Sequence, residues 1–336
     1  MNRLVKILAA YRQKISYVQK DIGSLLGMNT RFFKEARGTR IVLYHGICLE
    51  DHTRFNNIFL RLKTFEAHLQ FYKEYFHIIS LEDYYQQHFS KDRFNICITF
   101  DDGYANNYNY VLPLLEQYQV PATFFITAIR DAGYDILWND FLNITGKYGP
   151  EKLTYRKELF RKRRFNRYVS VTSQTSLVEI LRSGGFNPKA EMMELLQPLV
   201  PFRGNKAEED YWLQMTEMQI GKLSASEWVT IGCHGYYHND LARIGIDEAE
   251  NEILQSKQYL ERVTGKEIKA LAFPYGTYSR AVVSAAKKKN FTRLLALDFH
   301  FREDHADQAM RERFTVNPFI SINNQMIAII KGTYAF

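Results

Sequence analysis

The stretch FNICITFDDG, residues 94–103, decides the fold and points to a site. Its first seven residues are an apolar run of strand length, which is typical of a strand buried in a parallel sheet. Two adjacent carboxylates, Asp101 and Asp102, follow at the C-terminal end of this strand, where the active sites of α/β barrels gather. Their mutual repulsion opposes folding unless a cation or a proton lies between them. Asp-Asp-Gly is also a common turn sequence, so this stretch alone leaves a plain turn as the alternative.

Runs of the same kind recur along the chain and alternate with amphipathic helical patterns. Strands are predicted at 40–45, 76–79, 94–100, 121–127, 227–232, 268–273 and 292–297. Helices are predicted at 64–75, 109–118, 247–264 and 278–289. This alternation indicates an α/β fold with a parallel sheet covered by helices, and seven strands favour a closed barrel over an open sheet.

Two segments depart from this rhythm. Between about 136 and 220 the chain carries a basic cluster, a Ser-Gly-Gly turn and the prolines Pro188, Pro198 and Pro201, and we predict a mostly helical insertion there. Residues 1–39 are predicted to form a basic N-terminal helical segment, either docked on the barrel or lying on a membrane surface. Its apolar stripe comprises Leu4, Ile7, Leu8, Tyr11 and Ile15. The barrel is therefore expected to occupy 40–335, interrupted by the insertion.

The net charge of +7 is mild for 336 residues, but it is concentrated in seven basic side chains within residues 156–167. The cluster fits a solvated helix face, or a site for an anionic partner such as lipid headgroups or the phosphates of a lipid- or nucleotide-linked sugar. No known DNA- or RNA-binding motif accompanies the cluster, so no nucleic-acid partner is expected. Peripheral membrane contact is thus considered for both 1–39 and 156–167.

Cellular location and redox state follow from segments that the sequence lacks. No run reaches about 18 apolar residues, and charge interrupts the first 15 residues too early for a signal peptide, so we predict a cytoplasmic protein. Cys48, Cys97 and Cys233 lie in apolar segments, where reduced thiols behave as small hydrophobes. Disulfides are not expected.

A second motif, HGYYH at 234–238, follows another predicted strand. Two histidines four residues apart would share one face of a helical turn, from which both imidazoles can reach one metal ion. With one carboxylate they supply three ligands and leave positions open for water and substrate. A second carboxylate outside the ligand set can act as a base, which favours hydrolysis over the oxygenase chemistry that two histidines and a carboxylate also suit.

A third motif, FPYG at 273–276, ends the strand predicted at 268–273. Proline fixes the local turn, and the next amide, that of Tyr275, could stabilise an oxyanion. Taken alone, the motif is an ordinary turn sequence.

In this order the three motifs resemble those of the polysaccharide deacetylase family, the carbohydrate esterase family 4-like group with NodB homology. Two further stretches, LYHG at 43–46 and a segment from Thr64 to Asp83, resemble the opening of the biofilm and capsule-cluster subgroup. The resemblance covers roughly 40–135 and 216–335. It leaves the insertion and the first 39 residues unexplained.

The resemblance implies a distorted (β/α)7 barrel that deacetylates an acetylated, and by preference N-acetylated, sugar or glycan precursor with one divalent metal ion. Zn²⁺ is the favoured ion, with Ni²⁺, Co²⁺, Fe²⁺ and Mn²⁺ as alternatives. The implied roles are Asp101 as general base, Asp102, His234 and His238 as metal ligands, Tyr275 as the oxyanion amide, Tyr104 and Pro274 as substrate-binding residues, and His45 in a substrate or proton-transfer role.

The sequence departs from the family pattern in two places. Many members carry an arginine that contacts the base, where this chain has Ala272. Many also place a Leu-x-x-His motif late in the chain as the general acid, and no histidine follows His305 here. The acid could instead be His45, His300 or His305. These departures keep one alternative open, a catalytically impaired carbohydrate-binding protein of the same fold.

Overall fold

The computed structural model describes residues 3–335, with side chains from residue 12 onward. The stripe residues Leu4, Ile7, Leu8 and Tyr11 therefore lie outside the described side chains. No helix within the described range is long and apolar enough to cross a membrane.

A nine-stranded sheet forms the centre of the molecule, and every pair of neighbouring strands in it is parallel. The strands are β1 (Thr39–Tyr44), β4 (Phe76–Ile79), β5 (Phe94–Phe100), β6 (Ala122–Ile126), β10 (Val229–Cys233), β11 (Ala270–Ala272), β12 (Arg293–Ala296), β13 (Met310–Glu312) and β14 (Phe314–Thr315). Their order is β13-β12-β11-β10-β6-β5-β1-β14, with β4 paired to the first half of β5. Each of the seven predicted strands is present within a few residues of its expected bounds.

The segment 310–315 closes the sheet into a barrel. Its first part, β13, pairs with β12, and its second part, β14, pairs with β1 at the opposite end of the order. Between them the Arg313 amide donates to the carbonyl of Ala296 at 3.1 Å. With β13 and β14 taken as one segment, the ring has seven positions, which confirms the predicted (β/α)7 barrel. The prediction was wrong in one detail, because the seventh position belongs to 310–315 and not to 76–79.

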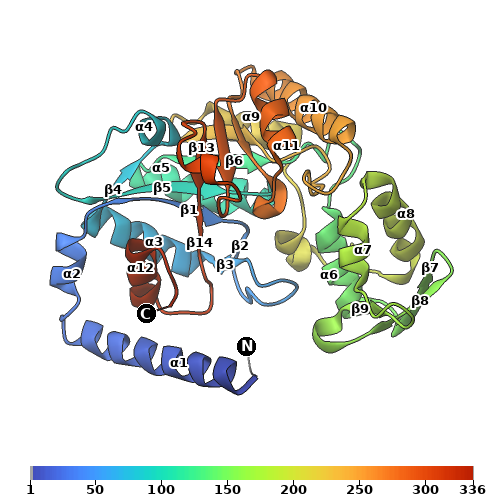
Figure 1. The fold of residues 1–336 in the computed structure, drawn as a ribbon, viewed down its shortest axis with the longest axis horizontal. Coiled ribbons are helices and arrows are strands. Elements are labelled where there is room, and N and C mark those ends of the chain that lie inside the picture. The colour runs from blue at the N-terminus through green and yellow to red at the C-terminus, as the bar shows by residue number, and fades with distance from the viewer. Residues whose placement is uncertain (1–2, 336) are drawn as a thin grey trace.

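Helices cover the outside of this barrel (Figure 1). They are α3 (Leu62–Tyr75), α4 (Leu81–Tyr85), α5 (Leu112–Tyr118), α9 (Glu217–Ala225), α10 (Ile246–Thr264), α11 (Arg280–Lys288) and α12 (Ile322–Lys331). Strand β5 is buried at all seven positions, as expected of a parallel strand with packing on both faces. A small cluster made by different strands includes Ile41, Cys97, Phe125, Ala272 and Leu295. All three cysteines are buried free thiols.

The insertion packs beside the barrel with a hydrophobic core of its own, which includes Trp138, Phe160 and Met192 (Figure 1). Its elements are α6 (Trp138–Tyr148), β7 (Lys152–Tyr155), β8 (Glu158–Lys162), β9 (Tyr168–Ser170), α7 (Leu177–Arg182) and α8 (Phe186–Leu196). The three strands form an antiparallel sheet among these helices. The basic cluster lies on β8 and its flanking turns, so a solvated helix face was the wrong interpretation. The seven cations are too closely spaced to show whether the period is that of a helix or of a strand.

Helix α1 (Arg3–Leu25) and the short α2 (Thr30–Glu35) precede the barrel. In Figure 1, α1 runs along the edge of the molecule beneath α12. The Tyr17 hydroxyl donates to the Tyr334 carbonyl at 2.9 Å, and the Asn324 side chain donates to the Tyr17 carbonyl at 3.1 Å.

The remaining elements are the strand pair β2 (Ile47–Cys48) and β3 (Leu60–Arg61), a π-helical turn at Asn107–Val111, and 3-10 turns at Arg164–Asn166, Gln197–Leu199, Lys206–Tyr211, Pro274–Gly276 and Arg302–His305.

Candidate active site

The first motif leaves the barrel immediately after β5, in a backbone conformation that side chains rarely adopt. Asp102 has φ of 76° and Gly103 has φ of 86°. A Cβ at Gly103 would lie 2.7 Å from Cγ2 of Ile126, so both the φ angle and the space require glycine there. A non-glycine residue at positive φ is strained and is commonly found at functional sites. This turn points two consecutive carboxylates into the mouth of the barrel, and both are at most 3% exposed.

The second motif is an irregular loop, so the expected helical turn was wrong. It is held from outside by Glu252 on α10, whose carboxylate accepts the amides of Tyr236 and Tyr237 at 3.1 and 3.2 Å. The same carboxylate accepts a hydrogen bond from the Asn239 side chain. With its amides anchored in this way, the loop can hold His238 in a left-handed conformation with φ of 57°. Both histidines still face the same point. Their arrangement results from the buried Glu252 carboxylate and not from helical periodicity.

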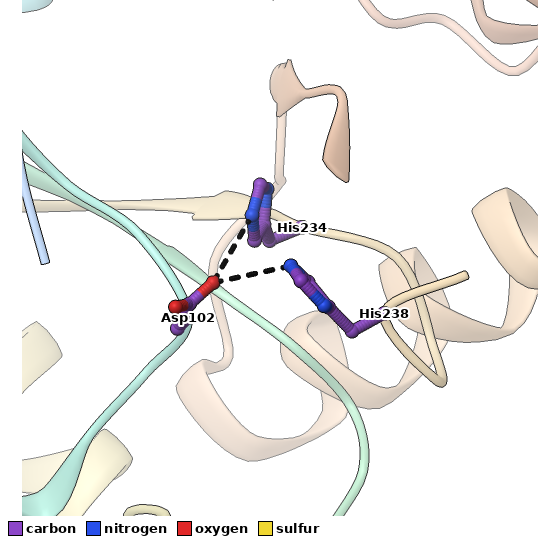
Figure 2. Close-up of side chains that lie close together, drawn as sticks. All are labelled: Asp102, His234 and His238. Carbon is purple, nitrogen blue, oxygen red and sulfur yellow. Dashed lines mark ion pairs between the residues drawn. The ribbon is translucent and has the colours of Figure 1, made fainter. Parts of the chain in front are cut away.

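Asp102, His234 and His238 converge on one point (Figure 2). The Oδ1 atom of Asp102 lies 3.4 Å from Nε2 of His234 and 3.2 Å from Nε2 of His238. The Nδ1 atom of His234 lies 2.8 Å from the Ala272 carbonyl, a contact that requires the proton on Nδ1 and leaves the Nε2 lone pair free. Two imidazole nitrogens and one carboxylate oxygen, all buried, are the donor set expected for Zn²⁺ or a similar ion. The residues therefore fit a divalent metal.

The pKa shifts favour the metal-binding forms of Asp102 and His238, whereas His234 has to release a proton when a metal binds. Burial alone would raise the pKa of Asp102, but His238 and His234 outweigh it and hold that pKa well below the usual value. Burial opposes the charged form of His234, yet Asp101 and Asp102 raise its pKa. At His238 burial prevails over the attraction of Asp102 and lowers the pKa, which favours the neutral imidazole. An ionised carboxylate and a neutral imidazole are the forms that bind a metal.

Asp101 lies beside this group and is held by a residue that the sequence did not single out. Arg313 donates from Nη1 to Oδ1 at 2.6 Å and from Nη2 to Oδ2 at 2.7 Å, and its own side chain is 1% exposed. Burial would raise the pKa of Asp101, but the Arg313 guanidinium and then His234 lower it overall. This two-point contact fixes the plane of the carboxylate and keeps it ionised. Many members of the family contact the base with an arginine at the position that Ala272 occupies here. In this chain Arg313 makes the contact with Asp101.

The third motif brings Tyr275 over the histidine pair. Its ring centre lies 4.8 Å from that of His238, and the Arg182 guanidinium lies 4.2 Å from the ring centre. Tyr275 has φ of 61°, and Pro274 before it is buried. The Tyr275 hydroxyl is buried and hydrogen-bonds to no group among the described residues. Burial and then the charge of Asp102 raise the pKa of this tyrosine well above its usual value.

The insertion supplies a wall of the site. The Trp138 indole N–H donates to the His238 carbonyl at 3.2 Å, and the Lys189 ammonium donates to Gly184 and to Asn239, the residue after that histidine. Phe186 stacks on Tyr237 with ring centres 4.1 Å apart. The insertion therefore braces the loop that carries the second motif.

Tyr104 and a second buried acid form a pair near Asp102. The Tyr104 hydroxyl donates to Oδ2 of Asp140 at 2.8 Å, and both side chains are at most 2% exposed. Burial and then the charge of Asp102 raise the pKa of Asp140 well above its usual value, which favours its protonated form. Tyr104 thus links the first motif to helix α6 of the insertion.

The three candidates for the general acid occupy different places. His45 follows β1, and burial lowers its pKa, while Asp102 and Asp101 are near enough to oppose that shift. His300 and His305 are exposed; His300 stacks on Tyr278, with ring centres 4.5 Å apart, and His305 packs edge-on against Phe299. His45 is therefore the candidate that the structure brings to the carboxylate pair.

Four functional neighbours escaped the sequence interpretation: Arg313, Asp140, Trp138 and Glu252. Arg313 lies in the short segment MRERFT, whose alternating charges resemble a surface strand and hide one buried cation. The acid beside a tryptophan in the run ILWNDF was a usable signal, because a carboxyl within an apolar run needs a partner. Glu252 lies on the inward face of the amphipathic helix α10. The helical period places this acid among the apolar positions, which was a second usable signal.

Comparison with known proteins shows which family this chain is similar to. The model of the family described as polysaccharide deacetylase matches residues 90–151 and 204–294, so its match skips most of the insertion. The peptidoglycan-N-acetylglucosamine deacetylase of Bacillus cereus is 35% identical over 72 residues. That alignment covers 21% of this chain and 26% of the relative, so the chain matches about a quarter of that protein's length.

Solved structures share the fold at low sequence identity. The deacetylase PplD of Streptococcus pyogenes, in complex with acetate, is 16% identical with a TM-score of 0.51, covering 87% of this chain and 97% of that chain. IcaB from Ammonifex degensii is 13% identical with a TM-score of 0.51, covering 88% and 98%. At these identities the similarity shows a shared fold.

Proposed function

We propose that the protein hydrolyses the acetyl group of an N-acetylated sugar or glycan precursor and releases acetate, because residues 90–151 and 204–294 match the model of the polysaccharide deacetylase family. The observation that carries the proposal is the arrangement of two carboxylates with different partners. Asp102 lies between two imidazoles, whereas Asp101, whose Oδ2 lies 3.6 Å from Nε2 of His234, is held by Arg313 through both of its oxygens. One carboxylate is thus available as a metal ligand and the other as a base.

Asp102, His234 and His238 would hold the metal ion. A divalent ion, with Zn²⁺ as our first choice, polarises the acetyl carbonyl and makes water easier to deprotonate. Asp101 accepts the proton of the attacking water, since Arg313 keeps its carboxylate ionised and oriented. The Tyr275 amide stabilises the developing oxyanion, and as the C–N bond breaks His45 delivers to the leaving amine the proton that Asp101 took from the water.

Tyr104 and Pro274 are proposed to line the sugar site, together with Tyr275 of the third motif and Trp138 of the insertion. Aromatic rings and a few polar groups are the usual lining of such sites. We extend the proposal to a lipid- or nucleotide-linked sugar as substrate. The basic surface of the chain supports this extension, because either linkage carries phosphate.

Acetate release from a panel of acetylated sugars tests the proposal. The panel contains free, nucleotide-linked and polyprenyl-linked sugars, and the protein is reconstituted with Zn²⁺. We expect release by the wild type and a loss of about 10²- to 10⁴-fold in Asp101→Asn, the usual contribution of a general base. That variant should retain metal at wild-type stoichiometry, whereas His238→Ala should lose it.

Asp298→Asn is the matched control, because Asp298 is an exposed carboxylate in a loop. It should release acetate at the wild-type rate. Full metal occupancy without release from any sugar would contradict the hydrolase and favour the carbohydrate-binding alternative. Equal rates for Asp101→Asn and wild type would contradict the role of Asp101 while leaving the reaction standing.

A further inference from the structure

Helix α1 turns its polar side toward the barrel. Gln13 and Tyr17 both donate to the Tyr334 carbonyl, at 2.5 and 2.9 Å. One turn further on, the Asp21 carboxylate accepts hydrogen bonds from Ser321 and Asn324 on α12, at 2.5 and 2.8 Å. A surface helix of a globular protein normally docks through its apolar stripe. This helix docks through hydrogen bonds.

The apolar side of α1 faces solvent instead. Ile15, Val18, Ile22 and Leu25 are spaced as one stripe along the helix and are 51%, 58%, 54% and 88% exposed. Three more exposed apolar side chains follow in the chain: Leu26 and Met28 in the turn after the helix, and Phe32 on α2. Seven of the seventeen exposed large hydrophobic side chains among the described residues thus fall within eighteen residues. A contiguous apolar patch of this kind marks an interaction surface.

Cations border this stripe at both ends. Arg12 and Lys14 are exposed near its start, and Arg31 and Lys34 are exposed near its end. The segment's two acidic residues are both paired: Asp21 is bonded to α12, as above, and Glu35 forms an ion pair with Arg31 at 2.7 Å. Glu35 offsets Arg31, so the net charge beside the apolar stripe comes from Arg12, Lys14 and Lys34 and is positive, which complements an anionic surface.

Charge also favours an anionic lipid surface over a second copy of α1 as the partner of this stripe. If two copies of α1 paired side by side in parallel along their stripes, Arg12 and Lys14 of one copy would lie beside the same cations of the other, and no acidic side chain of the segment is free to neutralise them. Anionic lipid headgroups would neutralise both ends while the acyl boundary took up the stripe. The other basic segment, 156–167, offers a weaker surface, because Arg156 is paired with Glu191 and its exposed apolar side chains, Leu159 and Phe165, form no comparable stripe.

We propose that residues 12–34 form a surface that docks on an anionic lipid bilayer. In the docked state α1 lies in the plane of the interface, with Ile15, Val18, Ile22 and Leu25 at the boundary between headgroups and acyl chains. The basic side chains contact the headgroups. The proposal goes beyond the deacetylase reaction and does not depend on it, since none of these residues belongs to the active site.

Sedimentation of the full-length protein with vesicles tests this proposal. Vesicles of phosphatidylcholine and phosphatidylglycerol at a ratio of seven to three are compared with pure phosphatidylcholine. We expect binding to the anionic vesicles that weakens as salt is raised. The double variant Ile22→Ser/Leu25→Ser should partition at least about tenfold more weakly, given the free energy of burying one such side chain. Arg12→Gln/Lys14→Gln should weaken binding to anionic vesicles by about five-fold per charge removed.

The matched control is Leu195→Ser/Leu199→Ser, which removes two exposed apolar side chains from the insertion. It should bind vesicles like the wild type. The two serine double variants, Ile22→Ser/Leu25→Ser and Leu195→Ser/Leu199→Ser, should have the melting temperature of the wild type, because the replaced side chains are exposed. A second readout is Val18→Trp, whose fluorescence should shift to the blue on anionic vesicles. Absence of vesicle binding by the wild type, or equal binding by Ile22→Ser/Leu25→Ser, would overturn the proposal. A dimer in solution that this variant abolishes, without vesicle binding, would identify a second copy as the partner.

Discussion

Replacing Arg313 by methionine should damage stability and activity through the same carboxylate. The variant leaves Asp101 buried, 3% exposed, with neither of the two short hydrogen bonds that hold it. Removing one partner of a buried ion pair costs about 3–5 kcal/mol, because the remaining charge has lost its compensation. We expect a loss of that size in the free energy of unfolding of the metal-loaded protein, measured by chemical denaturation.

Two further variants separate this effect from a general loss of packing. Asp101→Asn combined with Arg313→Met removes both charges, so it should be more stable than Arg313→Met alone. Arg311→Met removes a neighbouring arginine that lies over the Tyr85 ring, and it should cost no more than about 1 kcal/mol. If Arg313→Met unfolded at the wild-type denaturant concentration, the buried pair would not have the role assigned to it.

The pH profile of acetate release provides an independent check. Arg313 lowers the pKa of Asp101, so without this arginine the base stays protonated up to a higher pH. An opposite charge at contact distance lowers a carboxyl pKa by about one to three units. The acidic limb of kcat/KM should therefore move to higher pH by about that amount in Arg313→Met, and activity lost at neutral pH should partly return in alkaline buffer. An unmoved limb would refute the reasoning.

Three other predictions follow from the site. Chelation should lower the unfolding free energy by about 4 kcal/mol relative to protein in Zn²⁺ at a thousand times its Kd, and a thermal melt unaffected by chelator would contradict a metal centre. Burial lowers the pKa of Lys189 to about 8. Above pH 8 the unfolded chain therefore binds more protons than the folded one. The contribution of this residue to the unfolding free energy then rises with pH, by up to about 1.4 kcal/mol per pH unit. The unfolding free energy of wild type minus that of Lys189→Met should therefore increase between pH 8 and 10, and parallel curves would refute this. Trp138→Phe removes the hydrogen bond to the His238 carbonyl and should weaken Zn²⁺ affinity about tenfold by competition with a chelator, whereas unchanged affinity would show that the indole does not position the loop.

The strands and most of the barrel helices could be predicted because their signals are local. The run from Phe94 to Phe100 is apolar at five of its seven positions, and the structure buries every residue of it. Helix α10 spans 246–264, within one residue of its predicted start, because its apolar positions repeat with the helical period. The closing segment 310–315 carried no such signal. It is short, its charges alternate, and its pairing with β1 joins residues far apart in the sequence.

The same distinction applies to the insertion and to α1. The insertion could be predicted because the alternation of strand and helix patterns stops there. Its antiparallel sheet could not be predicted, because the run of cations shows no strand period. The stripe of α1 was recognised in part through Ile15, but the sequence left open which way the stripe faces. That orientation depends on the hydrogen bonds of Gln13, Tyr17 and Asp21 to partners about 300 residues away.

By itself the sequence determined the α/β barrel and the three motifs at its mouth, because strand periodicity and short motifs are encoded within a few residues. Only the tertiary structure decided how Asp101 and Asp102 divide their partners. Arg313 reaches Asp101 across 212 positions of the chain, and the loop of His234 and His238 takes its shape from a carboxylate on another helix. Such contacts depend on how separate elements pack, and no local pattern specifies that packing.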